Sequence, residues 1–286
     1  VLALGMMACM IAGGIDLSLV GIMNLSGVLA ALIVKNMVLI EGGEVANPAM
    51  VVPAIVLACL VAVAVGVACG AFNGFIIGYF GLPAMLVTLC GLQLYTGLAY
   101  GITGGPAING MCDAFKNIAN GTVAGIPYVL FIFIAVVAVV VFIMKCTVFG
   151  HEIYFLGSNP QAAMYSGINT LKVTIMTYMF SGILGGISGI LITSHLNSAK
   201  SSNGSTYTLL SLLIVVLGGV HPDGGKGRVA GVVLAVLLLQ MIANAFGLMH
   251  MSDNAKTFAN GCLLIAALVL SVVLEKRAAK KAAAAS

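Results

Sequence analysis

Long apolar segments separated by short polar stretches dominate this chain of 286 residues. A helix needs about 20 mainly apolar residues to cross the roughly 30 Å hydrocarbon layer of a bilayer, and several segments meet that length. The sequence contains no alternating amphipathic strands, so the pattern predicts an all-α, polytopic transmembrane helical bundle. Nine hydrophobic segments are expected, at residues 1–13, 18–39, 51–80, 84–101, 127–144, 172–195, 206–220, 229–249 and 256–274.

Two of these segments depart from the length of a simple span. The segment at 206–220 is short, and we expect a tilted or partial span there. The segment at 51–80 is long, and we expect it to end in a bend at Asn73-Gly74 or at Gly78.

The composition excludes an ordinary soluble domain, because 61% of the residues are hydrophobic, only 7% are charged, and the mean hydropathy is +1.17. The sequence has no CxxC pair and no hydrolytic motif of the GxSxG or HExxH type. His151, His195, His221 and His250 fall in different loops or span ends, so we expect no metal site and no cofactor. Most cysteines lie in apolar segments and are interpreted as small buried side chains: Cys9, Cys59, Cys69, Cys90, Cys112, Cys146 and Cys262.

The distribution of lysine and arginine predicts the orientation of the spans. With the C-terminus placed in the cytoplasm, eight basic residues fall inside and four outside, which is the expected bias. The polar stretch at 150–172 then lies in the cytoplasm and Val1 lies outside, so we expect one further span upstream of Val1. The inside residues are Lys145, Lys172, Lys226, Arg228, Lys276, Arg277, Lys280 and Lys281, and the outside residues are Lys35, Lys116, Lys200 and Lys256.

Glycines recur at helical spacing in two stripes and in one further pair. In lipid, such stripes let helix backbones approach closely and gain van der Waals contact. Helix packing is therefore the favoured interpretation, and a lining for a translocation pathway stays open as the alternative. One stripe is Gly66, Gly70, Gly74 and Gly78, another is Gly182, Gly185, Gly186 and Gly189, and Gly227 with Gly231 makes a third pair.

Asp16, in the sequence AGGIDLS, is the one acidic residue embedded in an apolar context. A carboxylate at mid-bilayer costs on the order of several kcal/mol, so such residues usually face a cavity or a partner. The predicted topology places Asp16 near the cytoplasmic end of the first span, where this cost falls. Two interpretations stay open: a structural cap or interface, with Ser18 as a second capping residue, or a role in a translocation pathway.

The glycine-rich loop GGVHPDGGKGR at 218–228 resembles a phosphate-binding loop but fails its pattern. The motif GxxxxGK needs a following Ser or Thr to ligate magnesium, and Gly227 stands there instead. The first required glycine is replaced by Val220. A turn whose glycines take positive φ is the better interpretation, so any ATP that this protein uses must be bound by another chain.

The polar stretch 150–172 predicts a short helix with defined ends. Asn159 is a good N-cap, Pro160 suits the first helical position, and Gly167 is a natural residue to end the helix. Such a helix of about two turns is too short to be stable alone, so neighbouring spans or a docked partner must hold it. Spacing alone leaves an interfacial connector and a docking element equally open.

Five stretches of the chain resemble one family, the permease subunits of ABC importers for simple sugars of the ribose, galactose and xylose type. They occur in the family's order and cover nearly the whole chain, and the motif GxNxxAAxxSGI is the most specific of them. The stretches are GGIDLS at 13–18, NGFIIGYFGLPAMLVTLCGLQLYTGLAYGITGG at 73–105, GSNPQAAMYSGIN at 157–169, SGILGGISGIL at 181–191 and VLGGVHPDGGKGRVAGVVL at 216–234.

The resemblance implies a type II ABC importer permease fold of about ten spans in the bacterial inner membrane. It implies one transmembrane permease domain at 1–275, a coupling helix near 159–167 that docks on the ATPase, and a cytoplasmic tail, partly linker-like, at 276–286. Implied partners are ABC ATPase subunits, an extracytoplasmic sugar-binding protein, a second permease subunit and membrane lipid, with no nucleic acid. The implied coupling residues are Asn159, Pro160, Ala162, Ala163, Ser166 and Gly167.

The sequence departs from the family in one place and leaves the substrate open. Many relatives carry an acidic TGYELDAIAA-like stretch where this chain has STYTLLSLLIVVLGG at 205–219. The expected substrate is a monosaccharide, with a nucleoside or a furanosyl signalling molecule as alternatives, and a secondary transporter or a structural subunit as rival classes. Polar residues expected to line the route are Asp16, Asn24, Asn73, Thr88, Gln93, Tyr95 and Asn244.

Overall fold

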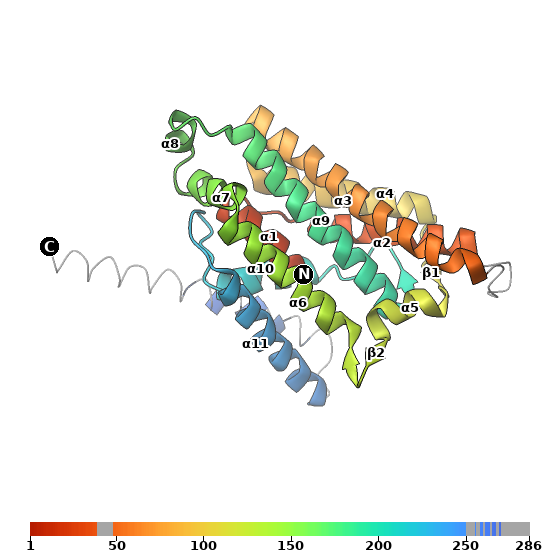
Figure 1. The fold of residues 1–286 in the computed structure, drawn as a ribbon. Helices are drawn as coiled ribbons and strands as arrows, with labels where there is room; N and C mark the ends of the chain where they lie inside the picture. Colours follow the sequence, from red (N-terminus) through yellow and green to blue (C-terminus); the bar gives the residue numbers. More distant parts are fainter. Residues whose placement is uncertain are drawn as a thin grey trace.

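The computed structural model describes residues 1–38 and 48–249, together with residues 255, 258, 259, 261–263, 265, 266 and 269. Within this part of the chain, six helices are long and apolar enough to cross a membrane (Figure 1). They are α2 (Leu19–Val38), α3 (Val51–Phe80) with the 3₁₀ turn η1 (Pro48–Met50) before it, α4 (Ala84–Thr103), α6 (Tyr128–Cys146), α9 (Thr170–Leu196) and α11 (Val229–Leu248).

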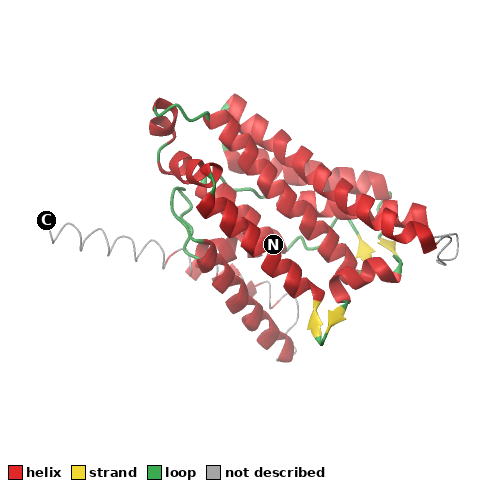
Figure 2. Cartoon of the chain, in the orientation of Figure 1, coloured by secondary structure: helices red, strands yellow, loops and turns green. Residues whose placement is uncertain are grey.

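Shorter elements accompany these helices within the described residues. Two short apolar helices are α1 (Leu2–Ile11) and α10 (Tyr207–Leu217), and the second confirms the short segment predicted at 206–220. Three more helices are α5 (Asp113–Asn120), α7 (Val148–Ser158) and α8 (Pro160–Tyr165). The sequence predicted α8 as the short helix near 159–167, whereas α5 and α7 were not predicted as separate elements. Two-residue strands form two small antiparallel pairs (Figure 2): β1 (Ile108–Asn109) with β4 (Ser198–Ala199), and β2 (Thr122–Val123) with β3 (Ile126–Pro127).

The described residues do not support the expected count of nine spans. Segments 1–13 and 206–220 form helices of 10 and 11 residues, which at about 1.5 Å per residue cross only half of a bilayer. The ninth segment, 256–274, lies largely outside the described residues, as does the tail at 276–286. The supported description is therefore a polytopic helical protein with six helices of spanning length.

The long segment at 51–80 does not bend where the sequence indicated. Helix α3 continues through Asn73, Gly74 and Gly78 and ends at Phe80, and Gly81 after it takes a left-handed φ of 64°. Asn73 and Gly74 are buried inside the bundle, where neighbouring helices hold the backbone in helical form. The polar residue and the glycines therefore serve packing and not a turn.

Helix α9 is the central element of the bundle and packs against α3, α2 and α1 (Figure 1). Its glycine stripe and that of α3 face each other. A side chain added at Gly182 would overlap the carbonyl oxygen of Gly66, and one at Gly70 would overlap that of Tyr178. Such backbone contact requires a residue without a side chain at the point of closest approach, so helix packing is confirmed as the role of both stripes. The third pair is different, because Gly227 precedes α11 and only Gly231 lies in it.

The cysteine interpretation is only partly right. Cys9 and Cys112 are buried, and Cys59 and Cys69 are half-buried. The remaining three, Cys90, Cys146 and Cys262, are exposed on the surface of this chain. An apolar segment predicts contact with lipid or another chain as readily as contact with the protein's own core.

The two ends of the bundle carry different elements. Helices α7 and α8 lie at one end, together with the loop at 218–228 and the start of α9. The β1–β4 pair and α5 lie at the other end, beside the last residues of α2 and α9 (Figure 1). Lys145 and Lys172 belong to the first end and Lys116 and Lys200 to the second, which is the separation that the distribution of basic residues predicted.

Candidate coupling surface and buried polar cluster

Two consecutive helices, α7 and α8, form the polar stretch that the sequence singled out. Thr147 caps α7 by accepting a hydrogen bond from Gly150 N at 3.2 Å. Asn159 ends α7 and begins α8, and its Oδ1 accepts a hydrogen bond from Ala162 N at 3.0 Å. Pro160 occupies the first helical position of α8, where its missing N–H leaves no hydrogen bond unmade. The predicted start of this helix is thus confirmed.

Helix α8 ends in a Schellman motif built on Gly167. Its φ of 82° lies in the left-handed region that glycine adopts without steric cost. Gly167 N donates to Met164 O at 3.1 Å and Ile168 N donates to Ala163 O at 3.1 Å, which closes the helix. Local hydrogen bonds therefore define both ends of a helix that has only six residues.

The surface of α8 differs from the surface that the motif implied. Ala163 is buried, whereas Tyr165 and Met164 are 85% and 57% exposed. Neither of these two large side chains was among the implied coupling residues. Of the six residues that were, four are exposed, Asn159, Pro160, Ser166 and Gly167, while Ala162 is half-buried.

The C-terminal end of α7 meets two other segments at a junction made of backbone. Gly225 N donates to Ile11 O at 2.8 Å, and Tyr154 Oη donates to Gly227 O at 3.0 Å. A side chain added at Gly157 would overlap Ile11 O. Burial raises the pKa of Tyr154, so its hydroxyl stays protonated and able to donate at neutral pH. The end of α1, the end of α7 and the loop at 218–228 are thus in direct contact.

Asp16 lies in the break between α1 and α2 and is fully buried. Its Oδ1 accepts hydrogen bonds from Ser18 N at 3.1 Å and from Ser18 Oγ at 2.6 Å. Its Oδ2 accepts a hydrogen bond from Ser181 Oγ, on α9, at 2.7 Å. Both carboxylate oxygens are therefore satisfied inside the protein, as burial of such a group requires.

Further polar residues extend this cluster to α3 and α4. Asn73 Nδ2 donates to Ser18 Oγ at 2.8 Å, and Tyr95 Oη lies 2.8 Å from Asn73 Oδ1 and 3.0 Å from Cys69 O. Thr88 Oγ1 lies 2.9 Å from Ile15 O. Four predicted route residues are therefore brought together: Asp16, Asn73, Thr88 and Tyr95.

The hydrogen-bonded cluster around Asp16 includes residues that lie well inside α9 and α3. The Asp16 partner Ser181 stands about 16 Å along α9 from Thr170, and Asn73 stands about 10 Å along α3 from Phe80. Residues 12–18 connect the short helix α1 to α2, and the predicted place of Asp16 near the cytoplasmic end of the first span stays a prediction. The structural-interface interpretation gains support from the hydrogen bonds, since Asp16 faces only protein groups.

Three other predicted route residues lie apart from the cluster. Asn24 is buried and donates from Nδ2 to Ser201 O at 2.7 Å. Gln93 is exposed on α4, on the face that points away from the bundle. Asn244 is exposed on α11 and accepts a hydrogen bond from Gln240 Nε2 at 3.2 Å. Sequence reasoning missed two residues, Ser181 and Tyr154. Ser181 lies among the glycines of its segment, and Tyr154 lies beside another aromatic residue, so neither residue is conspicuous in the sequence.

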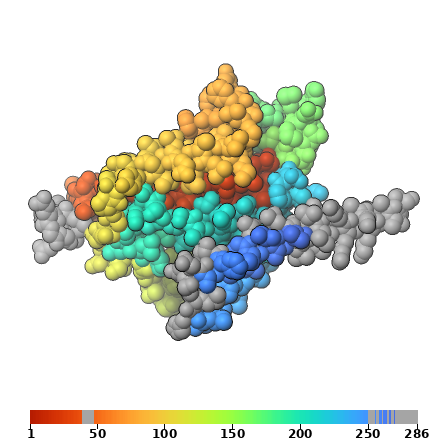
Figure 3. All heavy atoms as spheres, turned by 180° about the vertical axis from the view of Figure 1, so that it is seen from behind, coloured from red at the N-terminus to blue at the C-terminus, as the bar shows by residue number. Residues whose placement is uncertain are grey.

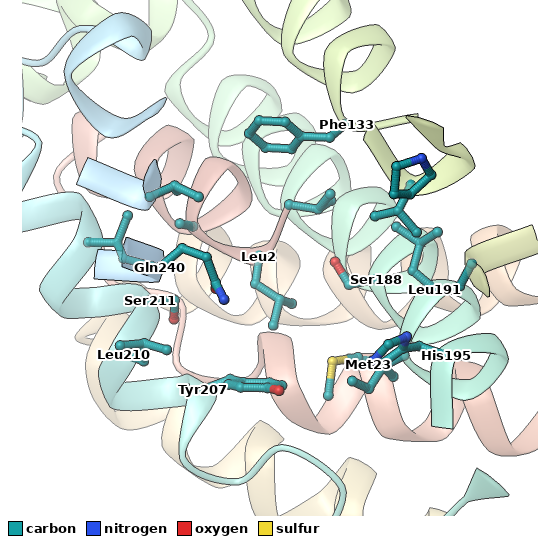
Figure 4. A pocket seen from close by; sticks show the side chains of 18 of the residues that line it. Leu2, Met23, Phe133, Ser188, Leu191, His195, Tyr207, Leu210, Ser211 and Gln240 are labelled. Atoms are coloured by element: carbon teal, nitrogen blue, oxygen red, sulfur yellow. The ribbon is translucent and has the colours of Figure 1, made fainter. Parts of the chain in front are cut away.

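A cavity of about 730 Å³ opens among α1, α6, α9, α10 and α11 (Figure 4). Its wall is mainly apolar, with Leu2 and Phe133 among the lining residues. His195, on its rim, forms a 2.9 Å contact between Nδ1 and Asn120 Oδ1. None of the predicted route residues lines it. Its polar lining residues include Ser188, Tyr207, Ser211 and Gln240.

A family model described as the permease component of branched-chain amino acid transport systems matches residues 1–268. The chain belongs to this permease family. The permease is 33% identical over 273 residues to the ribose import permease protein of Haemophilus influenzae. The aligned residues cover 94% of this chain and 80% of the relative. It is 27% identical over 282 residues to the L-arabinose transport system permease protein of Escherichia coli, covering 96% of this chain and 79% of the relative.

A third relative of the permease is an autoinducer 2 import system permease protein of Photorhabdus temperata. The two are 34% identical over 211 residues, which covers 72% of this chain and 63% of the relative. No solved structure matches the chain. The family membership agrees with the resemblance that the sequence motifs indicated.

Proposed function

We propose that this permease is the membrane-spanning subunit of an ATP-driven ABC importer that carries a monosaccharide across the bacterial inner membrane. The match to the ribose import permease over 94% of the chain is the observation that carries this proposal. The subunit makes no covalent bond, so ATP hydrolysis belongs to a partner chain. The failed phosphate-binding pattern at 218–228 is consistent with this division of labour.

Helix α8 is the proposed docking element for the ATPase. It is capped at both ends, and it presents Tyr165 and Met164 at the end of the molecule that the basic residues assign to the cytoplasm. An exposed aromatic and an exposed thioether are typical anchors for a hydrophobic cleft in a partner protein. Ala163 faces inward and holds α8 on its own subunit, while Asn159, Pro160 and Gly167 preserve its shape.

The outer face of α4 is the proposed boundary of the translocation route. Figure 3 shows this helix, in orange-yellow, along the surface of the molecule. Gln93 is exposed there, and side chains added at Gly97 and Gly101 would meet no atom within 4 Å. A polar residue beside two free glycines on an otherwise apolar face supports close approach of a second permease subunit, with Gln93 lining the route between them. The buried cluster around Asp16 would then hold α4 in place from inside.

An autoinducer-2 importer is the second candidate function. The Photorhabdus relative is as similar as the ribose relative where it aligns, at 34% identity, although the alignment covers less of both chains. The rival class of secondary transporter predicts several buried acids, and among the described residues Asp16 is the one buried carboxylate.

Reconstitution tests the proposal directly. The permease is placed in proteoliposomes with its ATPase and an extracytoplasmic binding protein, and uptake of ribose, arabinose and autoinducer-2 is measured with and without ATP. We expect uptake of one of them to require ATP hydrolysis and to stop with an ATPase that binds but does not hydrolyse ATP. Uptake that proceeds unchanged without hydrolysis, or that follows an ion gradient, would overturn the ABC importer function.

A further inference from the structure

We propose that Tyr154 and Gly157, at the end of α7, transmit movement of α8 to the buried Asp16 cluster and through it to α4. This inference rests on the proposed function, because it requires that α8 receives the movement of an ATPase. It goes further by naming the contacts through which the spans respond. Four observations along one continuous path support it.

The first step runs from α8 to α7. Asn159 is shared by the two helices, since its backbone N–H donates to Phe155 O in α7 and its side chain caps α8. Helix α7 is anchored by its buried residues Gly150, Ile153 and Leu156. A displacement of α8 is therefore applied to a helix that packs into the body of the subunit.

The second step crosses the glycine junction. Side chains added at Gly157 or Gly225 would collide with backbone of the neighbouring segments, so no flexible side chain separates these backbones. The hydrogen bond from Gly225 N to Ile11 O, 2.8 Å long, joins the loop to α1. Tyr154, which donates to Gly227 O, joins the same loop to α7. Close-packed backbone deforms little, so a shift of α7 moves the end of α1 with it.

The third step runs along the break between α1 and α2. Gly13, two residues after Ile11, has a φ of 89°, and a side chain added at Gly14 would overlap the buried hydroxyl of Tyr178. Only four residues lie between Ile11 and Asp16. The first part of this connection is a turn held to α1 by hydrogen bonds from Gly13 N to Met10 O and from Gly14 N to Cys9 O, so movement of α1 is passed on to the carboxylate.

The last step reaches α4. Thr88 binds Ile15 O at 2.9 Å, one residue before Asp16, and Tyr95 is connected to Ser18 through Asn73. Both Thr88 and Tyr95 lie on the inner face of α4, opposite Gln93. The path therefore begins at the ATPase surface and ends on the helix that carries the proposed route face.

The test uses the complete importer with Tyr154→Phe, which removes one hydrogen bond at the junction, and Gly157→Ala, which forces the junction apart. The ratio of sugar taken up to ATP hydrolysed is measured with whichever of ribose and arabinose the unmodified importer takes up. We expect the ratio to fall roughly threefold or more in both variants, with unchanged affinity for the ATPase. The matched controls are Tyr79→Phe, an exposed tyrosine stacked on Phe75, and Gly247→Ala, which has open space around it.

A double variant tests whether the path acts as a unit. If Tyr154→Phe and Tyr95→Phe interrupt the same path, the double variant loses no more than the worse single variant. Losses that multiply would overturn the proposal, as would a normal ratio in Tyr154→Phe. Should Gly157→Ala fail to fold, the Tyr154→Phe result still decides. Failure of the importer function itself looks different, because ATPase binding or ATP dependence is then absent in the unmodified protein.

Discussion

Ser181 and Asp16 stand 165 residues apart in the chain and are joined by a hydrogen bond of 2.7 Å from Ser181 Oγ to Asp16 Oδ2. Both residues are fully buried. The serine belongs to the glycine-rich stripe of α9, and the aspartate belongs to a break between helices. This contact connects the central helix of the bundle to the segment that links the coupling surface with α4.

The Asp16 carboxylate is expected to stabilise the bundle as a hydrogen-bond acceptor. Asp16→Ala leaves donors on Ser18 and Ser181 unsatisfied in a dry site, at about 1–3 kcal/mol each. We expect its unfolding midpoint, followed in detergent with a thiol-reactive dye that reads Cys9 and Cys112, to drop by about 5 °C or more. Asp16→Asn keeps an acceptor for Ser18 and offers a donor to the Ser181 oxygen, so its midpoint should stay near that of the unmodified protein.

The same experiment distinguishes the contribution of the negative charge of Asp16 from its contribution as a hydrogen-bond acceptor. Asp223→Ala is the control, because that carboxylate is 96% exposed and should leave the midpoint unchanged. An Asp16→Asn protein as unstable as Asp16→Ala would contradict the acceptor role and assign the stability to the charge.

Close contact between α3 and α9 should make Gly182 intolerant of even one methyl group. Gly182→Ala places a Cβ against Gly66 O, and overpacking of this kind typically costs about 1–3 kcal/mol. We expect a lower unfolding midpoint and less protein in the membrane fraction. Gly247→Ala is the matched control on α11, where nothing lies within 4 Å, and it should express normally. Equal behaviour of the two variants would show that the helices do not touch as described.

The N-cap of α8 should matter for docking more than for global stability. Asn159→Ala removes the hydrogen bond to Ala162 N, a loss of about 1 kcal/mol that falls on a helix of six residues. We expect weaker binding of the ATPase in a pull-down titration while the unfolding midpoint stays constant. Asn159→Asp retains the acceptor and should restore binding. Weak binding in both variants would mean that the amide itself, and not the cap, contacts the partner.

Substitutions at an exposed residue and at a buried residue of α8 should affect stability differently. Tyr165→Ala removes a side chain that is 85% exposed, so we expect ATPase affinity to fall about tenfold with no change in the unfolding midpoint. Ala163→Arg places a charged group at a buried position, so we expect a lower midpoint in addition to loss of coupling. The docking surface is wrongly assigned if Tyr165→Ala binds the ATPase normally.

Local sequence signals determined the membrane class and the detail of α8. Hydrophobic segment length depends only on composition within about 20 residues, and six such segments appear as helices of spanning length. The Asn159 cap and the Gly167 ending involve backbone groups within four residues, so spacing alone predicted them. The family motif at 157–169 spans the end of α7, all of α8 and the turn before α9.

Only the tertiary structure decided which distant groups meet. Nothing in the sequence pairs Asp16 with Ser181, Tyr154 with Gly227, or Gly157 with Ile11, because each contact follows from how long helices pack side by side. The same packing kept α3 helical through Asn73, against the local tendency to turn, because Asn73 hydrogen-bonds to Ser18 inside the bundle. Hydropathy and capping are short-range properties, whereas a polar group buried in a bundle takes its partners from helices that the fold alone places beside it.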